Sequence, residues 1–183
     1  MRIVVSGTHA SGKSTLVADF CARHPQYTPM PDPFEELDEA DDRPGASLFV
    51  AQLALSARRL VDGHDPDVIA ERGPLDFLAY LTAWDELGRS DVPGDLLRRA
   101  RETTTAAMTE VDLLVVLPLN GADRIWVHPE EDLELRDAMD EALLELADDT
   151  ELLGAHTRVV EIVGDRSARL AALDAAVSAR HDD

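Results

Sequence analysis

A glycine-rich segment near the start of the chain has the residue types that bind phosphate. It consists of Gly7, Thr8, His9, Ala10, Ser11, Gly12, Lys13, Ser14 and Thr15, and it fits the pattern G-x-x-x-x-G-K-[ST]. In such a loop, backbone N–H groups point at phosphate oxygens, and the lysine adds a full positive charge near the β- and γ-phosphates. We predict that residues 7–15 bind the phosphates of ATP and that the Ser14 hydroxyl ligates the accompanying Mg²⁺.

The residues around this loop support the same prediction. The β-branched run 2–6 is typical of a buried strand, and residues 15–22 are typical of a helix. A helix that begins at the loop adds the partial positive charge of its N-terminus to the phosphate site. Lys13 is the only lysine in the chain, which otherwise uses arginine for positive charge. The compact ammonium group of a lysine suits phosphate. A chance match in a glycine-rich turn is the alternative.

A carboxylate and a guanidinium follow a second apolar run. Residues 67–71 are typical of a strand that ends in Glu71, and Arg72 comes next. A carboxylate at that position can reach Mg²⁺, and a guanidinium can bind the transferred phosphoryl group through two hydrogen bonds. We predict these roles for Glu71 and Arg72, with a structural ion pair as the alternative. Asp112 is a poorer metal ligand, because it precedes its strand and belongs at the opposite sheet edge.

Asp32 is the candidate general base. It follows a short strand at 27–30 and lies between two prolines, which stiffen the local backbone. A carboxylate there could accept the proton of an attacking hydroxyl group. An ordinary turn aspartate is the alternative, and Glu35 and Glu36 are weaker rivals for the role.

Two arginines lie in the acidic segment that follows the apolar run 111–117. Arg124 and Arg136 could close over the phosphates and neutralise charge in the transition state, together with Trp126. We therefore predict a lid at about 119–136. The alternative is a solvated surface with ion pairs.

Two helical stripes carry side chains that could face a ligand. Gln52 lies on an apolar stripe between Leu48 and Leu55, where a polar group faces either a ligand or solvent. Three aromatic residues share one face of the next predicted helix and serve either as core or as a surface that stacks on a substrate ring: Phe77, Tyr80 and Trp84.

Strands and helices alternate along the chain. The hydrophobic patterns predict strands at 2–6, 27–30, 67–71, 111–117 and 158–163, and helices at 15–22, 46–61, 74–87, 95–110, 130–147 and 166–179. This order indicates an α/β protein with a five-stranded parallel sheet covered by helices on both faces, the three-layer P-loop NTPase fold, in one domain 1–183. Ligands bind at the carboxyl ends of such strands, where the phosphate loop, Asp32 and Glu71 all lie.

The composition of the chain restricts the kinds of binding partner and the cellular location that we expect. The formal net charge is −20, which argues against binding to nucleic acid or to an anionic membrane. No apolar run approaches the roughly 20 residues of a membrane span. Cys21 is the single cysteine, and the first strand begins at the N-terminus, so we expect no disulfide, no signal peptide and a cytoplasmic location. A homodimer remains open.

With these motifs assembled, the chain resembles the small-molecule branch of P-loop kinases. This group contains deoxynucleoside kinases, thymidylate kinases and proteins similar to nicotinamide riboside kinase. The segment 71–81, ERGPLDFLAYL, resembles the region of their Asp/Glu-Arg motif. The segment 30–35, MPDPFE, resembles the strand end where deoxynucleoside kinases carry a catalytic base, usually glutamate. The resemblance implies that Glu71 binds Mg²⁺, that Arg72 steers hydroxyl and phosphate, and that Arg124 and Arg136 form the lid.

The sequence therefore predicts ATP- and Mg²⁺-dependent phosphoryl transfer to a small acceptor, a nucleoside or a nucleotide. Two rivals remain: a P-loop ATPase or GTPase that regulates a partner without any small acceptor, and a nucleotide-binding protein with little turnover. A kinase needs a second cleft beside Asp32 and Arg72, whereas a switch needs room there only for water.

Overall fold

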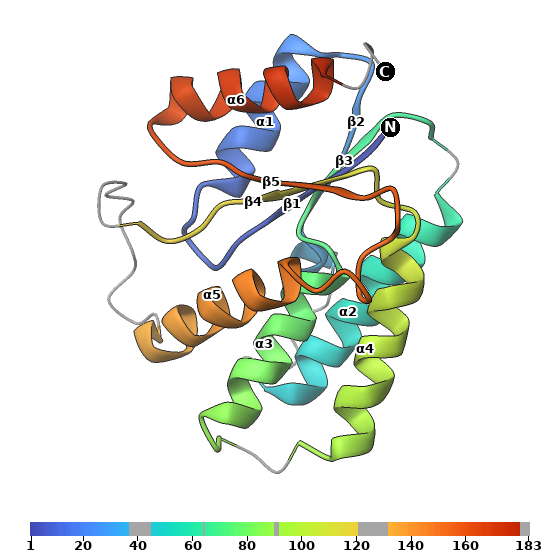
Figure 1. The fold of residues 1–183 in the computed structure, drawn as a ribbon, viewed down its shortest axis with the longest axis vertical. Coiled ribbons are helices and arrows are strands. Elements are labelled where there is room, and N and C mark those ends of the chain that lie inside the picture. The colour runs from blue at the N-terminus through green and yellow to red at the C-terminus, as the bar shows by residue number, and fades with distance from the viewer. Residues whose placement is uncertain (37–44, 64, 90–91, 121–131, 180–183) are drawn as a thin grey trace.

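The fold is built on a parallel sheet of five strands. A computed structural model describes residues 1–36, 45–63, 65–89, 92–120 and 132–179. The strands are β1 (Arg2–Ser6), β2 (Thr28–Met30), β3 (Val68–Glu71), β4 (Leu113–Val116) and β5 (Arg158–Glu161), in the order β2-β3-β1-β4-β5 (Figure 1). β1 therefore lies in the centre, paired with β3 on one side and β4 on the other. The phosphate loop that follows β1 is thus held in the middle of the sheet edge.

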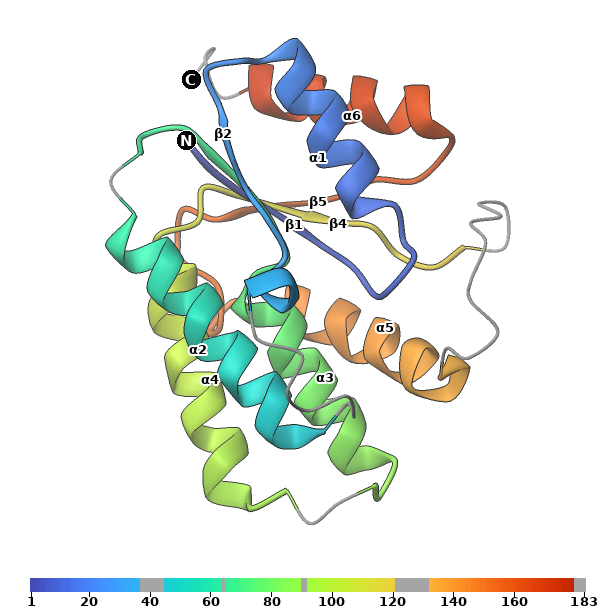
Figure 2. The same cartoon turned by 180° about the vertical axis from the view of Figure 1, so that it is seen from behind.

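Helices cover both faces of this sheet. α1 (Lys13–Arg23) and α6 (Arg166–Ser178) pack on one face, and the other four helices pack on the opposite face (Figures 1 and 2). Those four are α2 (Ala46–Asp62), α3 (Pro74–Glu86), α4 (Gly94–Met108) and α5 (Leu133–Ala147). A short 3₁₀ helix, η1 (Pro33–Glu36), follows β2. The predicted three-layer fold is confirmed.

The two faces have separate apolar cores because side chains alternate along each strand. Ile3 and Val5 of β1 belong to the core under α1 and α6, whereas Val4 belongs to the core under α2 to α5. All four residues of β4 are fully buried, as the continuous apolar run predicts for a parallel strand covered on both sides.

The predicted elements all occur, with shifts of a few residues at their ends. β4 has four residues rather than the seven of the apolar run 111–117, and α5 begins at Leu133 rather than at residue 130. Asp112 lies at the amino edge of the sheet, as predicted, and its Oδ2 accepts a hydrogen bond from the Arg2 amide at 2.7 Å. Among the described residues, none of the helices combines the length and the apolar character needed to cross a membrane.

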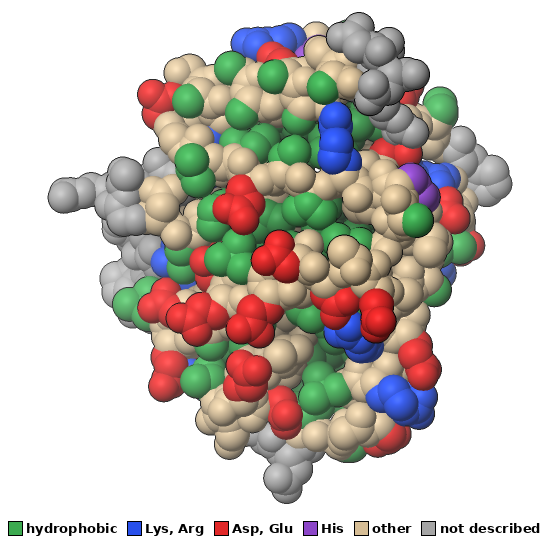
Figure 3. Space-filling model, viewed as in Figure 1, with side chains coloured by type: hydrophobic (Ala, Val, Ile, Leu, Met, Phe, Trp, Pro, Cys, Tyr) green, Lys and Arg blue, Asp and Glu red, His purple; other side chains and the backbone are tan. Residues whose placement is uncertain are grey.

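The negative charge lies on the outside of the molecule. Figure 3 shows carboxylates gathered over α5, which exposes Glu134, Asp137, Glu141 and Glu145. The cations of the phosphate loop region are instead directed inward: Lys13 and Arg72 are both buried. These two cations therefore place positive charge at the carboxyl edge of the sheet, where an anionic ligand would bind.

Candidate active site

The loop between β1 and α1 has the tight backbone that phosphate binding requires. Gly12 caps α1 with φ +94°, in the region that favours glycine. At Gly7, an added Cβ would lie 2.6 Å from Ser11 Oγ and 2.9 Å from the Leu117 carbonyl oxygen, so no side chain fits there. α1 begins at Lys13, two residues before the predicted start, which places the lysine at the N-terminus of the helix.

Lys13 is buried inside this loop. Only 4% of the residue is exposed, and its Nζ donates a hydrogen bond to the Thr8 carbonyl oxygen at 2.7 Å. Burial, followed by the nearby Arg72 cation, lowers the pKa of Lys13 to about 7. Phosphate oxygens would favour the charged ammonium form, so the lysine and an anionic ligand are electrostatically coupled.

Ser14 and Glu71 come together at the mouth of the loop. Ser14 Oγ donates a hydrogen bond to Glu71 Oε1 at 2.6 Å, across 57 residues of sequence. Both groups are hard oxygen donors, and Mg²⁺ is bound by one or two protein oxygens together with phosphates and water. Within the described ranges, no group of three or more His, Cys, Asp or Glu side chains could hold a metal. The two oxygens of the Ser14–Glu71 pair have the chemistry to hold Mg²⁺ that would arrive with a nucleotide.

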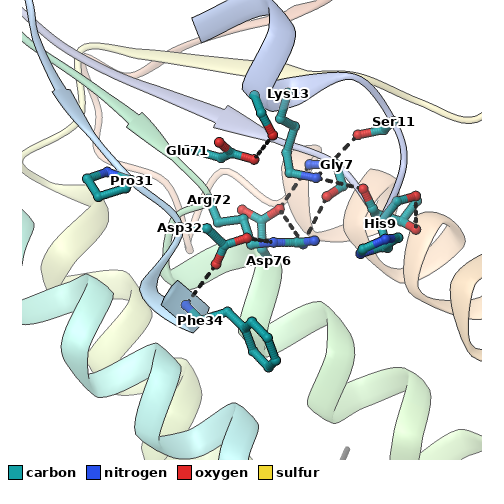
Figure 4. A network of polar contacts seen from close by, with 12 residues as sticks. Gly7, His9, Ser11, Lys13, Pro31, Asp32, Phe34, Glu71, Arg72 and Asp76 are labelled. Atoms are coloured by element: carbon teal, nitrogen blue, oxygen red, sulfur yellow. Dashed lines mark hydrogen bonds and ion pairs between the residues drawn. The ribbon is translucent and has the colours of Figure 1, made fainter. Parts of the chain in front are cut away.

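Arg72 and Asp32 form a buried ion pair between β3 and β2 (Figure 4). Arg72 Nε donates to Asp32 Oδ2 at 2.6 Å, and Arg72 Nη1 donates to the Gly7 carbonyl oxygen at 3.1 Å. The guanidinium also lies over the Tyr80 ring, 5.5 Å from its centroid. Burial acts to lower the pKa of Arg72, but Tyr80, Asp32 and Asp76 together raise it above its ordinary value. The arginine therefore stays charged, in a fixed position.

The Arg72 backbone is itself unusual, because its φ of +65° is rare for a residue with a side chain. Such a conformation persists only where several contacts hold it, and strained residues of this kind cluster at functional sites. Asp32 is held as well, since its Oδ1 accepts a hydrogen bond from the Phe34 amide at 3.0 Å. Arg72 thus forms its ion pair with Asp32 rather than with Glu71, and its role at the transferred phosphoryl group stays a prediction.

Asp76 joins the phosphate loop to α3, a role that the sequence analysis missed. This fully buried carboxylate accepts hydrogen bonds from Ser6 Oγ at 2.6 Å and from the amides of Gly7 and Gly73, both at 2.9 Å. Its position three residues after Gly73 is the local sign of a helix cap, because an acidic residue there can bind the preceding backbone. No local pattern reveals the second half of the contact, on a loop about 70 residues earlier.

A single cavity of about 740 Å³ joins the phosphate loop to the Asp32–Arg72 pair. Beyond that pair it continues between α2 and α3, into a part that we call the acceptor end: Asp32, Phe34, Leu48, Phe49, Gln52, Arg72 and Tyr80. Gln52 is only 3% exposed, so the solvent-facing alternative for this residue is wrong. The kinase hypothesis requires a cleft of this kind.

The aromatic residues of α3 belong to the core, and two of them also line the cavity. Tyr80 stacks on Phe49 with ring centroids 4.9 Å apart, and Trp84 contacts Phe49 edge-on, so these rings form part of the core. Phe77 and Tyr80 also line the cavity. Phe34 is 61% exposed at the rim, and its ring lies apart from the polar contacts (Figure 4).

The structure places one of the two predicted lid arginines, and the lid itself stays a prediction. Arg136 lies on α5 and donates from Nε to the His9 carbonyl oxygen at 2.9 Å, so it borders the phosphate loop and lines the cavity. Asp140, one turn further on, accepts the Leu119 amide with both oxygens at 3.1 Å, which anchors the chain after β4. Arg124 and Trp126 lie outside the described residues.

The sheet order, the phosphate loop and the adjoining cavity together define a P-loop kinase fold. Solved structures bear this out. The chain is similar to thymidylate kinase from Candida albicans, at 15% identity and a TM-score of 0.65, over 98% of this chain and 92% of that one. It is also similar to deoxyadenosine kinase from M. mycoides with bound dATP, at 15% identity and a TM-score of 0.72, over 97% of this chain and 100% of that one.

The same M. mycoides enzyme with bound dCTP matches at 14% identity and a TM-score of 0.70, over 98% of this chain and 100% of that one. No protein-family model and no curated protein sequence matches the chain. The chain therefore has the fold of the P-loop deoxynucleoside and thymidylate kinases, as its motifs predict.

Proposed function

We propose that this protein is an ATP- and Mg²⁺-dependent kinase that phosphorylates a hydroxyl group of an uncharged, ring-bearing acceptor, most simply a nucleoside. One observation carries the proposal: the cavity that contains the phosphate loop extends past Asp32 and Arg72 into the acceptor end. A P-loop switch needs space for one water molecule at that point, whereas this cavity has room for a small molecule.

The charges at the acceptor end favour a hydroxyl acceptor over a phosphate acceptor. Among the described residues that line this end, Arg72 is the only cation, and its Nε and Nη1 are already bound to Asp32 and the Gly7 carbonyl. A nucleoside monophosphate would bring its phosphate close to the Asp32 carboxylate, and no further cation among the described lining residues of this end would offset the repulsion. A neutral acceptor instead meets aromatic rings and the Gln52 amide, which suit a planar heterocycle.

The residues can be given roles in an in-line transfer. The loop amides and Lys13 bind the β- and γ-phosphates, and Ser14 and Glu71 hold Mg²⁺, which supplies further positive charge to the phosphate oxygens. Asp32 accepts the proton of the attacking hydroxyl, while Arg72 holds that carboxylate in place. Arg136 adds positive charge at the donor side of the cavity.

Release of ADP with candidate acceptors tests the proposal. Mg·ATP is incubated with each common nucleoside and, separately, with its 5′-monophosphate, and Lys13→Met provides the background. We expect one or more nucleosides to raise ADP release well above basal hydrolysis, with a phosphorylated nucleoside as the product. If only monophosphates do so, the acceptor class is wrong. If only a protein partner does so, the switch hypothesis replaces the kinase.

A further inference from the structure

A buried arginine on α6 contacts the phosphate loop from outside the cavity. Arg169 is only 6% exposed, although it carries a charge and lies in the second turn of a surface helix. Its Nη1 donates to the Ser11 carbonyl oxygen at 2.5 Å, and its Nε donates to the Gly164 carbonyl oxygen at 2.8 Å. Burying a guanidinium costs free energy, which these hydrogen bonds offset. The position of the two carbonyl acceptors then indicates what the buried arginine does.

The Ser11 carbonyl has a special position in the loop. It shares a peptide unit with the amide of Gly12, which belongs to the set of loop amides that point at phosphate in this type of loop. A cationic donor on the carbonyl oxygen polarises that peptide unit, and the amide at its other end then becomes a stronger donor. The same hydrogen bond fixes the orientation of the whole peptide plane.

The second contact ties another loop to the first. Gly164 follows β5 and has φ +107°, so the chain turns there with a backbone that favours glycine. Arg169 joins this turn to the phosphate loop through one planar guanidinium. Its partner in the loop, Ser11, lies 158 residues earlier in the sequence. Both carbonyls belong to loops at the carboxyl edge of the sheet, where a nucleotide would bind.

Other contacts attach α6 to the rest of the molecule. Arg166, one turn earlier, forms two hydrogen bonds of 2.6 Å with Asp19 of α1. Leu173 and Val177 are buried in the core under α1 and α6. Packing of α6 on the rest of the molecule therefore does not depend on Arg169 alone. The contacts of Arg169 with the Ser11 and Gly164 carbonyls indicate a role in the phosphate loop instead.

We propose that Arg169 is a positioning residue for the nucleotide donor, which orients and polarises the Ser11–Gly12 peptide so that its N–H binds phosphate. The role rests on the phosphate-binding part of the proposed function and is independent of the acceptor. The Ser11–Gly12 peptide binds the phosphate chain rather than the base. Arg169 therefore supports the binding of a triphosphate without a base in the same way as that of ATP.

Calorimetric affinities for Mg·ATP and for magnesium tripolyphosphate test this role, in three variants at two arginines of α6. Arg169→Met is expected to weaken both ligands by about tenfold, the size of effect of one charge-assisted hydrogen bond. Arg166→Met removes an ion pair from the same helix without touching the loop, and should change both affinities by less than twofold. Arg169→Lys keeps the charge but cannot reach both carbonyls, so its affinities should fall between wild type and Arg169→Met.

A second readout separates positioning from simple structural support. The amide ¹⁵N resonance of Gly12 responds to the hydrogen bond on the Ser11 carbonyl, and should shift in Arg169→Met but not in Arg166→Met. If both variants weaken the ligands equally, or if Arg169→Met lowers only the melting temperature, the positioning role is wrong. If wild-type protein binds neither ligand, the proposed function fails with it.

Discussion

Asp32 and Arg72 lie 40 residues apart in the sequence, yet Arg72 Nε donates to Asp32 Oδ2 at 2.6 Å in the interior of the cavity. β2 and β3 are neighbours in the sheet, so the residues that follow them meet at its carboxyl edge. The pair lies where the phosphate loop meets the acceptor end. A hydroxyl group placed beside the pair would face both a base and a cation, which is the arrangement that phosphoryl transfer to an alcohol needs.

Replacing Asp32 by Asn tests whether this carboxylate is the base. The amide keeps the shape of the side chain and cannot take a proton. Its oxygen can still accept from Arg72, while the Phe34 amide, which is an exposed partner, can bind water instead. We expect turnover to fall by about 10²–10⁴-fold, because a positioned base contributes that much, while the affinity for Mg·ATP stays unchanged. Steady-state kinetics and calorimetry measure the two quantities. Wild-type turnover in Asp32→Asn would reduce Asp32 to a turn residue, and Glu35→Gln would then be the next variant to measure.

The lowered pKa of Lys13 makes nucleotide binding depend on pH. Since that pKa is about 7, the free protein loses the Lys13 proton as pH rises above 7, whereas bound phosphates hold the proton on. Binding at pH 8.5 therefore takes up close to one proton, and the Kd for Mg·ATP rises by up to about tenfold per pH unit above 7. Below pH 7 the lysine is already charged and the dependence disappears.

Calorimetry of Mg·ATP binding in buffers of different ionisation enthalpy counts these protons directly. Lys13→Arg is the matched control, because arginine stays charged throughout this pH range. Its Kd should not vary with pH over the same interval. A wild-type Kd that is equal at pH 6.5 and pH 9 would contradict the coupling.

Glu71→Gln tests the metal site. The amide can still accept the Ser14 hydrogen bond but carries no charge, so the Mg²⁺ concentration that gives half-maximal activity should rise by about tenfold or more. Affinity for ATP measured without metal should not fall. Glu161→Gln, at the exposed end of β5, removes a carboxylate from another strand end and serves as the control. Equal metal dependence in both variants would leave Glu71 as a surface residue.

Asp76→Asn is expected to lower the free energy of unfolding of the protein. The carboxylate accepts from the amides of Gly7 and Gly73 with different oxygens, and an amide group must turn its own N–H₂ toward one of those donors. A buried donor left without a partner costs about 1–3 kcal/mol of unfolding free energy. Asp85→Asn, on the exposed side of the same helix, should be close to neutral. Urea unfolding measures both, and equal free energies would contradict the role of Asp76.

The fold follows from sequence because its signals are local. Alternating strands and helices fix a parallel sheet, and the phosphate loop fixes the edge at which ligands bind. The same rule places Asp32 and Glu71 at that edge, and the structure brings Ser14 to Glu71 as metal binding would require. The catalytic and metal roles of these residues remain predictions, as do the lid roles of Arg124 and Arg136.

The parts of the site that sequence missed depend on contacts between distant segments. Asp76 has the local pattern of a helix cap, and in the sequence Arg169 looks like an ordinary basic residue of a surface helix. Their importance comes from backbone groups of the phosphate loop, which carry no side-chain signal. Gln52 could be read either way, because a polar residue on an apolar stripe becomes informative only when the cavity beside it is known.

Gln52 therefore provides the sharpest test of the acceptor end. The residue is 3% exposed, and among the described residues of this end it is the one carboxamide, able to donate and accept hydrogen bonds on the edge of a planar heterocycle. Gln52→Leu keeps a similar volume and removes both functions. A pocket that no longer pairs the polar edge of its substrate loses discrimination as well as affinity. We expect kcat/KM for the preferred nucleoside to fall by about 10²-fold or more, while the Kd for Mg·ATP and the stability are maintained.

Gln52→Asn is the second variant: it keeps the amide but draws it back by one carbon, so partial activity is expected. If Gln52→Leu phosphorylates every nucleoside as the wild type does, the amide does not contact the acceptor, and the specificity of the site must come from the aromatic walls instead.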